Sequence, residues 1–194
     1  MVMNKAYKVS VIALVAVITY SLVFAGSFAD NTVDDKVDEV KILYQTTEAS
    51  VIDQAHCLAT NIYFEARHQE YEEKEAIANV VINRTKDKSF PDTICGVVYQ
   101  AVRDSNGNPL RNKCQFSWYC DGKSDKIKDV YAYEEDFLIA LIVIANREEE
   151  GLDNDYTYDN TNNSLWYHAH YVDPYWAKAY TLQQRIGAHL FYSR

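Results

Sequence analysis

The sequence predicts a mainly α-helical domain with a small β-sheet, an α+β fold. Apolar residues recur at helical spacing in two successive segments, about 50–68 and 71–86. Nine consecutive apolar residues, Phe137–Ala145, predict a buried central helix. Near the C-terminus, the segments 164–172 and 185–194 favour extended structure. The length of 194 residues suits one domain with a short N-terminal extension.

Residues 1–29 have the features of an export signal. Two lysines precede the nearly continuous apolar run Val9–Ala25, and Ser27 and Ala29 frame a small-x-small site. This pattern predicts cleavage after Ala29 and places the protein in the periplasm or cell envelope. The apolar run has about 17 residues, the lower limit for crossing a membrane, so an uncleaved membrane anchor is the alternative.

The residues after the signal divide into a spacer and a domain. Residues 30–47 are polar and rich in acids, which is typical of a spacer, and the domain is expected at 48–194. The net charge of −9 argues against a nucleic-acid partner, since such proteins carry a basic stripe. We expect a monomer that meets a membrane only through its N-terminal segment, and we expect no cofactor.

The four cysteines of an exported chain predict two disulfides. Three pairings are possible, and the sequence does not choose among them. We favour Cys114–Cys120, which closes a local loop, and Cys57–Cys95, which ties the first helix to a later segment. A zinc site is the alternative, but no CxxC or HxxxH spacing accompanies the cysteines, so no metal is expected.

The first predicted helix carries a carboxylate on its apolar face. Val51, Leu58 and Ile62 recur at helical spacing and define a core-facing stripe. Two helical turns take about 7.2 residues, so Glu65 points nearly the same way as Leu58. Burial raises the pKa of a carboxyl group, and a protonated carboxyl in a groove is what a general acid acting on a glycosidic oxygen requires.

Glu65 also has a structural interpretation, in which it pairs with Arg67 or Arg84. In the second helix, Glu72, Glu73 and Glu75 are expected at the surface, where acids complement the helix dipole. The apolar face of that helix is expected to consist of Ala76, Ile77, Val80 and Val81.

The remaining segments are shorter. We expect a helix over about 93–101, a turn-rich loop over 104–109 and a disulfide-stapled loop over 114–122. The central helix should end on a glycine cap at Gly151. A further helix is expected over 174–184, before the closing strand.

Three histidines lie near the C-terminus. On a strand, His168 and His170 would share one face, which gives a metal two ligands without a third. A structural or substrate-contacting role is therefore the better interpretation of this pair. His189 is expected to pack or to form a hydrogen bond locally.

Four blocks of the chain resemble the SleB-type cell wall hydrolases, the spore cortex-lytic family. They are Asn61–Arg67 running into Ala76–Arg84, Phe90–Gln100, Cys114–Gly122, and Tyr167–Tyr192. The resemblance implies a lysozyme-like or lytic-transglycosylase-like fold. It also implies cleavage of the β-1,4 bond between N-acetylmuramic acid and N-acetylglucosamine in peptidoglycan. The catalytic Glu of the family, in its E-A-R motif, matches Glu65.

The resemblance further suggests residues that bind the glycan. Gln115 and Ser117 match a family segment whose polar side chains would bond substrate N-acetyl groups, although they could instead be caps within the stapled loop. Tyr167, His168 and Trp176 belong to the C-terminal block and are candidates for the groove wall.

Departures and alternatives concern the details of the reaction. The family commonly has a His where this chain has Trp166, which puts contacts at that subsite in doubt. Without a second carboxylate, Glu65 would act as a lytic transglycosylase. Hydrolysis would need one, for which Asp121 is the best candidate and Glu70 and Asp173 are weaker ones.

Two other function classes are alternatives. One is a metal-dependent peptidoglycan amidase or peptidase that uses His168, His170 and an acid. The other is a non-catalytic glycan-binding domain, against which an intact Glu65 argues.

Overall fold

The computed structural model describes residues 49–149 and 159–194. Contacts divide the chain into two units, 1–52 and 53–194, and only the last four residues of the first unit are described. The predicted signal, the spacer and the cap at Gly151 lie outside the described residues. The predicted domain boundaries therefore stay predictions.

Helices make up about half of the described residues, and the strands form two small antiparallel sheets, which confirms the α+β class. The long helices are α3 (Ala49–Ala66), α4 (Tyr71–Lys86) and α6 (Val130–Glu149), and the short ones are α5 (Ile94–Val98) and the 3₁₀ turns η1 (Ser117–Cys120) and η2 (Tyr175–Ala179). The strands are β1 (Ala101–Arg103), β2 (Pro109–Cys114), β3 (Trp166–Ala169), β4 (Thr181–Ile186) and β5 (His189–Ser193). Within this part of the chain, no helix combines the length and the apolar character needed to cross a membrane.

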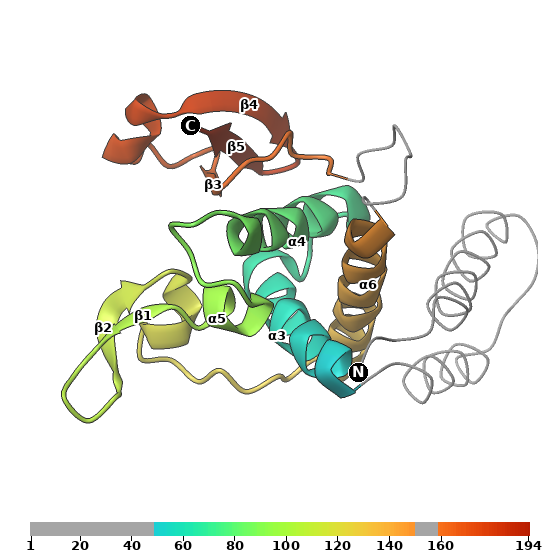
Figure 1. The fold of residues 1–194 in the computed structure, drawn as a ribbon, viewed down its shortest axis with the longest axis vertical. Coiled ribbons are helices and arrows are strands. Elements are labelled where there is room, and N and C mark those ends of the chain that lie inside the picture. The colour runs from blue at the N-terminus through green and yellow to red at the C-terminus, as the bar shows by residue number, and fades with distance from the viewer. Residues whose placement is uncertain (1–48, 150–158) are drawn as a thin grey trace, which may run out of the picture. The chain divides into compact units, whose positions relative to one another are not determined.

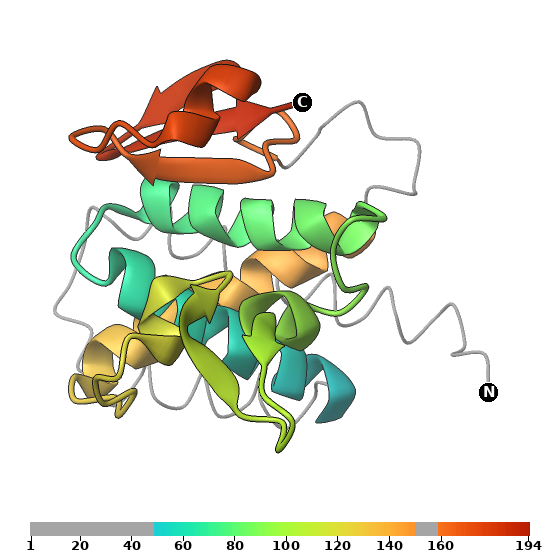
Figure 2. The same cartoon turned by 90° about the vertical axis from the view of Figure 1, so that its left-hand side faces the viewer.

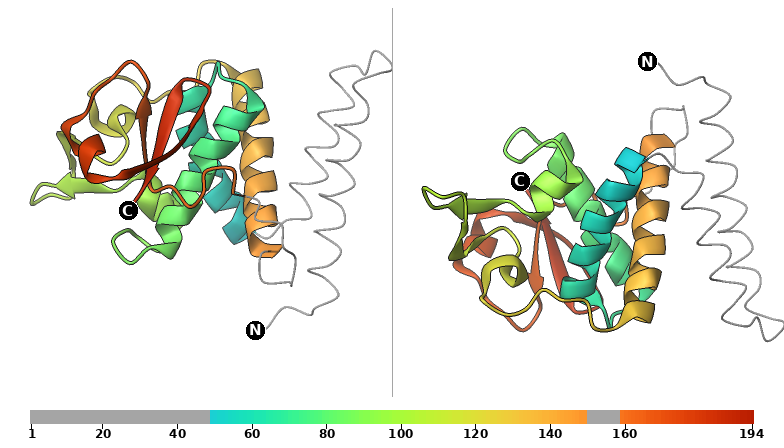
Figure 3. Two further views of the ribbon diagram at one scale, coloured as in Figure 1. Left: turned by 90° about the horizontal axis from the view of Figure 1, so that it is seen from above. Right: turned by 90° about the horizontal axis from the view of Figure 1, so that it is seen from below.

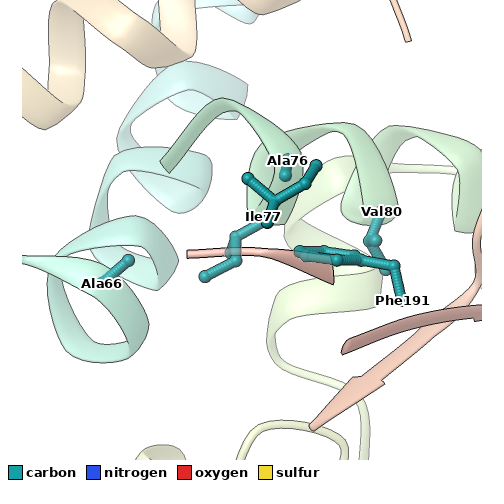
Figure 4. Packing of buried hydrophobic residues seen from close by; sticks show 6 residues of the cluster. Ala66, Ala76, Ile77, Val80 and Phe191 are labelled. Atoms are coloured by element: carbon teal, nitrogen blue, oxygen red, sulfur yellow. The ribbon is translucent and has the colours of Figure 1, made fainter. Parts of the chain in front are cut away.

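Helix α4 is covered on two sides. The three-stranded sheet, ordered β3-β5-β4, lies along one side of α4, and α3 and α6 lie on the other (Figures 1 and 2). Phe191 of β5 packs against Ile77 and Val80 of α4 in a buried cluster with Ala66 and Ile186 (Figure 4). All four residues of the predicted apolar face are fully buried, which confirms that prediction.

Helices α3 and α6 run side by side (Figure 3). The His56 ring stacks on Phe137 with 4.5 Å between ring centroids. Leu58 and Ile62 of the predicted stripe are fully buried.

Both favoured disulfides are present. Cys57–Cys95 links α3 to α5, and Cys114–Cys120 closes the loop between β2 and η1. A disulfide stabilises a fold mainly by restricting the unfolded chain. The second bridge also holds the segment that carries Ser117 next to the hairpin of β1 and β2.

The register of the sheet decides which side chains face α4. Tyr167 of β3 pairs with Phe191 of β5, and Ala169 pairs with His189. Since side chains alternate along a strand, Tyr167, His189 and Phe191 share one face. Phe191 is in the core against α4, so Tyr167 and His189 point to the same side.

A buried polar network fixes the start of β3. The Asp159 carboxylate accepts hydrogen bonds from the backbone N–H groups of Thr161 and Asn163, each at 2.8 Å. Asn83 of α4 donates to the same carboxylate at 2.8 Å. The network ties the chain entering β3 to α4, and this sets the position of Tyr167.

Two sequence-based expectations about these elements were wrong. The segment 174–184 is not a helix, because only a 3₁₀ turn forms before β4 begins at Thr181. The expected closing strand 185–194 instead holds the end of β4, a turn at Gly187 and β5. The expected central helix is present as α6, which begins at Val130, before its apolar run. The expected loop over 104–109 joins two short strands, β1 and β2, that were not expected.

A buried ion pair joins α4 to α6. Lys74 is 2% exposed, and its Nζ lies 2.9 Å from the Asp136 carboxylate, which is fully buried. Burial raises the pKa of Asp136 to about 6, against the opposing effect of Lys74. Such a pair adds little net stability over an apolar pair, but losing one partner leaves an uncompensated buried charge.

We predict that Lys74→Met lowers the free energy of unfolding by about 3–5 kcal/mol, because Asp136 is left buried without its cation. Changing Asp136→Leu in the same protein should recover much of the loss. Denaturant unfolding at neutral pH measures both variants. Lys88→Met, at an exposed position, is the matched control. A Lys74→Met protein as stable as that control would show that the pair is not structurally important.

Candidate active site

A cleft of about 480 Å³ lies between the end of α3, the η1 region and the three-stranded sheet. From α3 and the η1 region, its lining includes Phe64, Glu65, Ser117, Trp118 and Asp121. The loop after η1 contributes Lys123, Ser124 and Asp125. The sheet and its loops contribute Tyr167, His168, Ala169, Tyr171 and His189.

Glu65 lies in the last turn of α3 and is partly buried. The Tyr167 hydroxyl donates a hydrogen bond to Oε2 of Glu65 at 3.2 Å. Beside it, the Phe64 ring stacks on Trp118 with 4.8 Å between centroids. Glu65 therefore has an aromatic wall next to it and one hydroxyl partner.

The pKa of Glu65 is raised, because burial penalises its charged form more than its neighbours favour it. The Tyr167 hydrogen bond and the Arg84 charge both lower this pKa and only partly oppose burial. Burial and the nearby Glu65 raise the pKa of Tyr167 well above its usual range. Tyr167 thus stays protonated and acts as the donor.

Arg84 provides the positive charge behind this pair. Its guanidinium is buried between the rings of Phe90 and Phe116, 5.2 Å from each centroid, and its Nε donates to the Leu165 carbonyl at 2.8 Å. Burial lowers the pKa of Arg84 to about 10, so it remains charged at neutral pH.

The structural interpretation of Glu65 as half of an ion pair does not match its contacts. Within residues 49–149 and 159–194, no ion pair of Glu65 with Arg67 or Arg84 is found. Arg67 instead lies over the Tyr63 ring, 4.6 Å from its centroid, and donates to its hydroxyl. Arg84 affects Glu65 only through the electrostatic effect of its charge, which lowers the pKa of the carboxyl.

Of the other predicted site residues, some line the cleft and some do not. Ser117, Asp121, Tyr167 and His168 line the cleft together with Glu65. The remaining two predicted binding residues do not line it: Gln115 is partly buried beside η1, and Trp176 packs edge-on against His168.

The carboxylates proposed for hydrolysis are also separated. Asp121 lines the cleft, and its pKa is lowered by the backbone N–H and the side chain of Lys123. Its Oδ1 accepts from that N–H at 2.8 Å. Glu70, at the N-cap of α4, and the exposed Asp173 do not line the cleft.

His168 and His170 do not share a face of a strand, because β3 ends at Ala169. Both ring nitrogens of His168 are engaged, Nδ1 with the Ala169 carbonyl at 3.0 Å and Nε2 with the Tyr192 hydroxyl at 2.9 Å. His170 is exposed. Among the described side chains, no three His, Cys, Asp or Glu residues are grouped as metal ligands would be.

The prediction for Glu73 was wrong, and the prediction for His189 was confirmed only for its packing. Glu73 is not a surface charge: it is 2% exposed, and its Oε1 lies 2.5 Å from Nδ1 of His189. His189 is buried and packs edge-on against Tyr167, as expected. It also lines the cleft, and its bond to Glu73 spans 116 positions rather than being local. Nothing in the local sequence of either residue signals this contact.

The loop that closes one side of the cleft is held by Tyr63. Its hydroxyl accepts hydrogen bonds from the backbone N–H groups of Lys128 at 3.2 Å and Asp129 at 3.0 Å. These bonds fix the chain that follows Lys123–Asp125. Sequence reasoning missed this loop and the aromatic wall of Phe64 and Trp118, which polar motifs do not reveal.

The model of the Cell Wall Hydrolase family matches residues 68–192. This range is more than half of the chain, and the protein belongs to that family. The match confirms the predicted class of enzyme. The matched range begins three residues after Glu65 and includes Arg84, Tyr167 and His189.

Individual relatives share shorter stretches. A spore cortex-lytic enzyme of Oceanobacillus iheyensis is 42% identical over 43 residues, which cover 22% of this chain and 16% of that protein. Two solved structures align with 72% of this chain. The catalytic domain of the Bacillus cereus SleB protein is 23% identical, with 89% of its chain covered and a TM-score of 0.48. The catalytic domain of the germination-specific lytic transglycosylase SleB of Bacillus anthracis is 22% identical, with 93% covered and a TM-score of 0.44.

We predict that Tyr167→Phe shifts the alkaline limb of the pH profile for cell-wall lysis to higher pH. The Tyr167 hydroxyl favours the ionised form of Glu65, so its removal raises the pKa of that carboxyl further. The group then stays protonated at higher pH. Tyr175→Phe, at a side chain that is 91% exposed, should leave the limb in place. A shift of the limb to lower pH would contradict the assigned hydrogen bond.

Proposed function

We propose that this protein is an exported peptidoglycan glycosidase that cleaves the β-1,4 bond between N-acetylmuramic acid and N-acetylglucosamine as a lytic transglycosylase. The observation that carries the proposal is Glu65, a partly buried cleft carboxyl whose pKa is raised by burial. A lysozyme-like or lytic-transglycosylase-like fold is part of the proposal. So are cleavage of the segment 1–29, or anchoring through residues 9–25, and a monomeric state.

Glu65 serves in turn as general acid and general base. Protonated, it donates to the glycosidic oxygen, and the bond to the muramyl C1 breaks with its electron pair remaining on that oxygen. The Glu65 carboxylate then removes the proton of the muramyl 6-hydroxyl. The freed oxygen bonds to C1 and closes a 1,6-anhydro ring, so the proton returns to Glu65 and no water is consumed.

The neighbours of Glu65 suit both halves of this cycle. Burial favours the protonated acid before bond cleavage. Once Glu65 is ionised, the Tyr167 hydroxyl and the buried charge of Arg84 stabilise the carboxylate. These groups are already in place, so little reorganisation is needed during the reaction.

A muramidase reaction is the second candidate, and Asp121 is the observation that favours it. This carboxylate lines the same cleft, and Lys123 holds it in the ionised form. A second carboxylate could position a water or form a covalent intermediate. Mass spectrometry of digested cell walls separates the reactions: anhydro-muropeptides identify a transglycosylase, reducing muropeptides a muramidase and free stem peptides an amidase.

We predict that Glu65→Gln lowers the rate of wall lysis by at least about a hundredfold, the low end for removing a general acid. The amide has the same shape but has no acidic proton to transfer. Turbidity loss of purified cell walls measures the rate, and circular dichroism checks the fold. Glu72→Gln, on the exposed side of α4, is the matched control and should keep the parent rate. Near-parental lysis by a folded Glu65→Gln protein would refute the assignment.

A further inference from the structure

The turn between β4 and β5 is built around the carboxylate of Glu73. Its Oε1 accepts a hydrogen bond from the Ala188 backbone N–H at 3.1 Å and lies 2.5 Å from Nδ1 of His189. Gly187 has a φ of +54°, and a Cβ atom there would lie 1.8 Å from Oε2 of Glu73. Only a glycine leaves room for this carboxylate, so Glu73 is fitted into the turn rather than resting against it.

These contacts determine which ring nitrogen of His189 carries the proton. Oε1 of Glu73 accepts from the Ala188 N–H, and a carboxylate oxygen has no hydrogen to donate. Nδ1 of His189 therefore carries the hydrogen that it shares with Glu73. In the neutral ring, the lone pair is then on Nε2. The hydrogen-bond partner of one ring nitrogen decides which of the two nitrogens carries the proton.

The His189 ring reaches the cleft beside the proposed acid. It lines the cleft and meets Tyr167 edge-on, with 5.3 Å between ring centroids. Tyr167 in turn bonds Glu65, so one aromatic ring separates His189 from the proposed acid. Nε2 has no hydrogen bond to a described residue, whereas both nitrogens of His168, on the opposite face of β3, are engaged.

We propose that His189 is a substrate-binding residue and that Glu73 is its positioning residue. Nε2 accepts a hydrogen bond from a hydroxyl or acetamido N–H of the N-acetylated sugar held next to Glu65. Glu73 fixes the ring and its tautomer from the far side, through the turn of the sheet. The inference rests on the proposed function, whose substrate-binding site it extends.

A matched pair of substitutions separates this role from a purely structural one. The amide nitrogen of Asn can replace Nδ1 and keep the bond to Glu73, but it leaves nothing at the position of Nε2. The amide of Gln reaches the position of Nε2 but loses the bond to Glu73. We expect His189→Asn to keep most of the thermal stability and to raise KM for uncrosslinked glycan strands about tenfold, which corresponds to about 1.4 kcal/mol.

His189→Gln should show the reverse pattern, with a lower melting temperature and KM within about threefold of the parent at a temperature where it is folded. If His189 only ties the sheet to α4, the Asn variant keeps the parental KM and the inference is overturned. A measurement without any change at position 189 guards against misfolding. In the Glu65→Gln protein, the ¹⁵N shift of His189 Nε2 should move when uncrosslinked glycan strands are added, and an unmoved shift overturns the inference.

Failure of the proposed function would look different. In that case the unsubstituted protein would release no anhydro-muropeptides from cell walls, whatever residue stands at position 189. Lysis by the unsubstituted protein together with a parental KM in the Asn variant would refute only the role of His189.

Discussion

The packing of the three-stranded sheet against α4 is the contact on which the cleft depends. Phe191 inserts between α4 and the sheet, and the register of β5 then brings Tyr167 and His189 to the same face. Without this contact, the end of α3 would be open to water and Glu65 would be an ordinary exposed acid. The same packing thus builds the core and raises the pKa of the proposed catalytic group.

Burial and polar contacts act on Glu65 in opposite directions. Desolvation favours its protonated form, whereas the Tyr167 hydroxyl and the Arg84 charge favour the carboxylate. A group that acts first as a general acid and then as a general base needs both effects. A pKa that is too high would prevent the base step, and one that is too low would prevent the acid step. Arg84 can remain charged at full burial because Phe90 and Phe116 enclose it and the Leu165 carbonyl accepts its Nε–H.

The sequence predicted what local periodicity determines and missed what distant contacts determine. Glu65 on the stripe of α3 and the buried face of α4 followed from helical spacing. Glu73 was expected at the surface because its partner, His189, lies 116 positions away. Residues 181–184 of the expected helix 174–184 become strand, because pairing with β5 outweighs the helix propensity of Leu182, Gln183 and Gln184.

The central claim is that burial in the cleft makes Glu65 a weaker acid than an exposed glutamate. Nuclear magnetic resonance titration of the side-chain carboxyl ¹³C signals, with Glu65 assigned by its loss in a Glu65→Gln protein, measures this most directly. The account predicts that the Glu65 carboxyl titrates at a pH above the ordinary value of an exposed Glu, because burial raises its pKa. Titration at or below that value would contradict the account, since burial would then have no net effect on the Glu65 carboxyl.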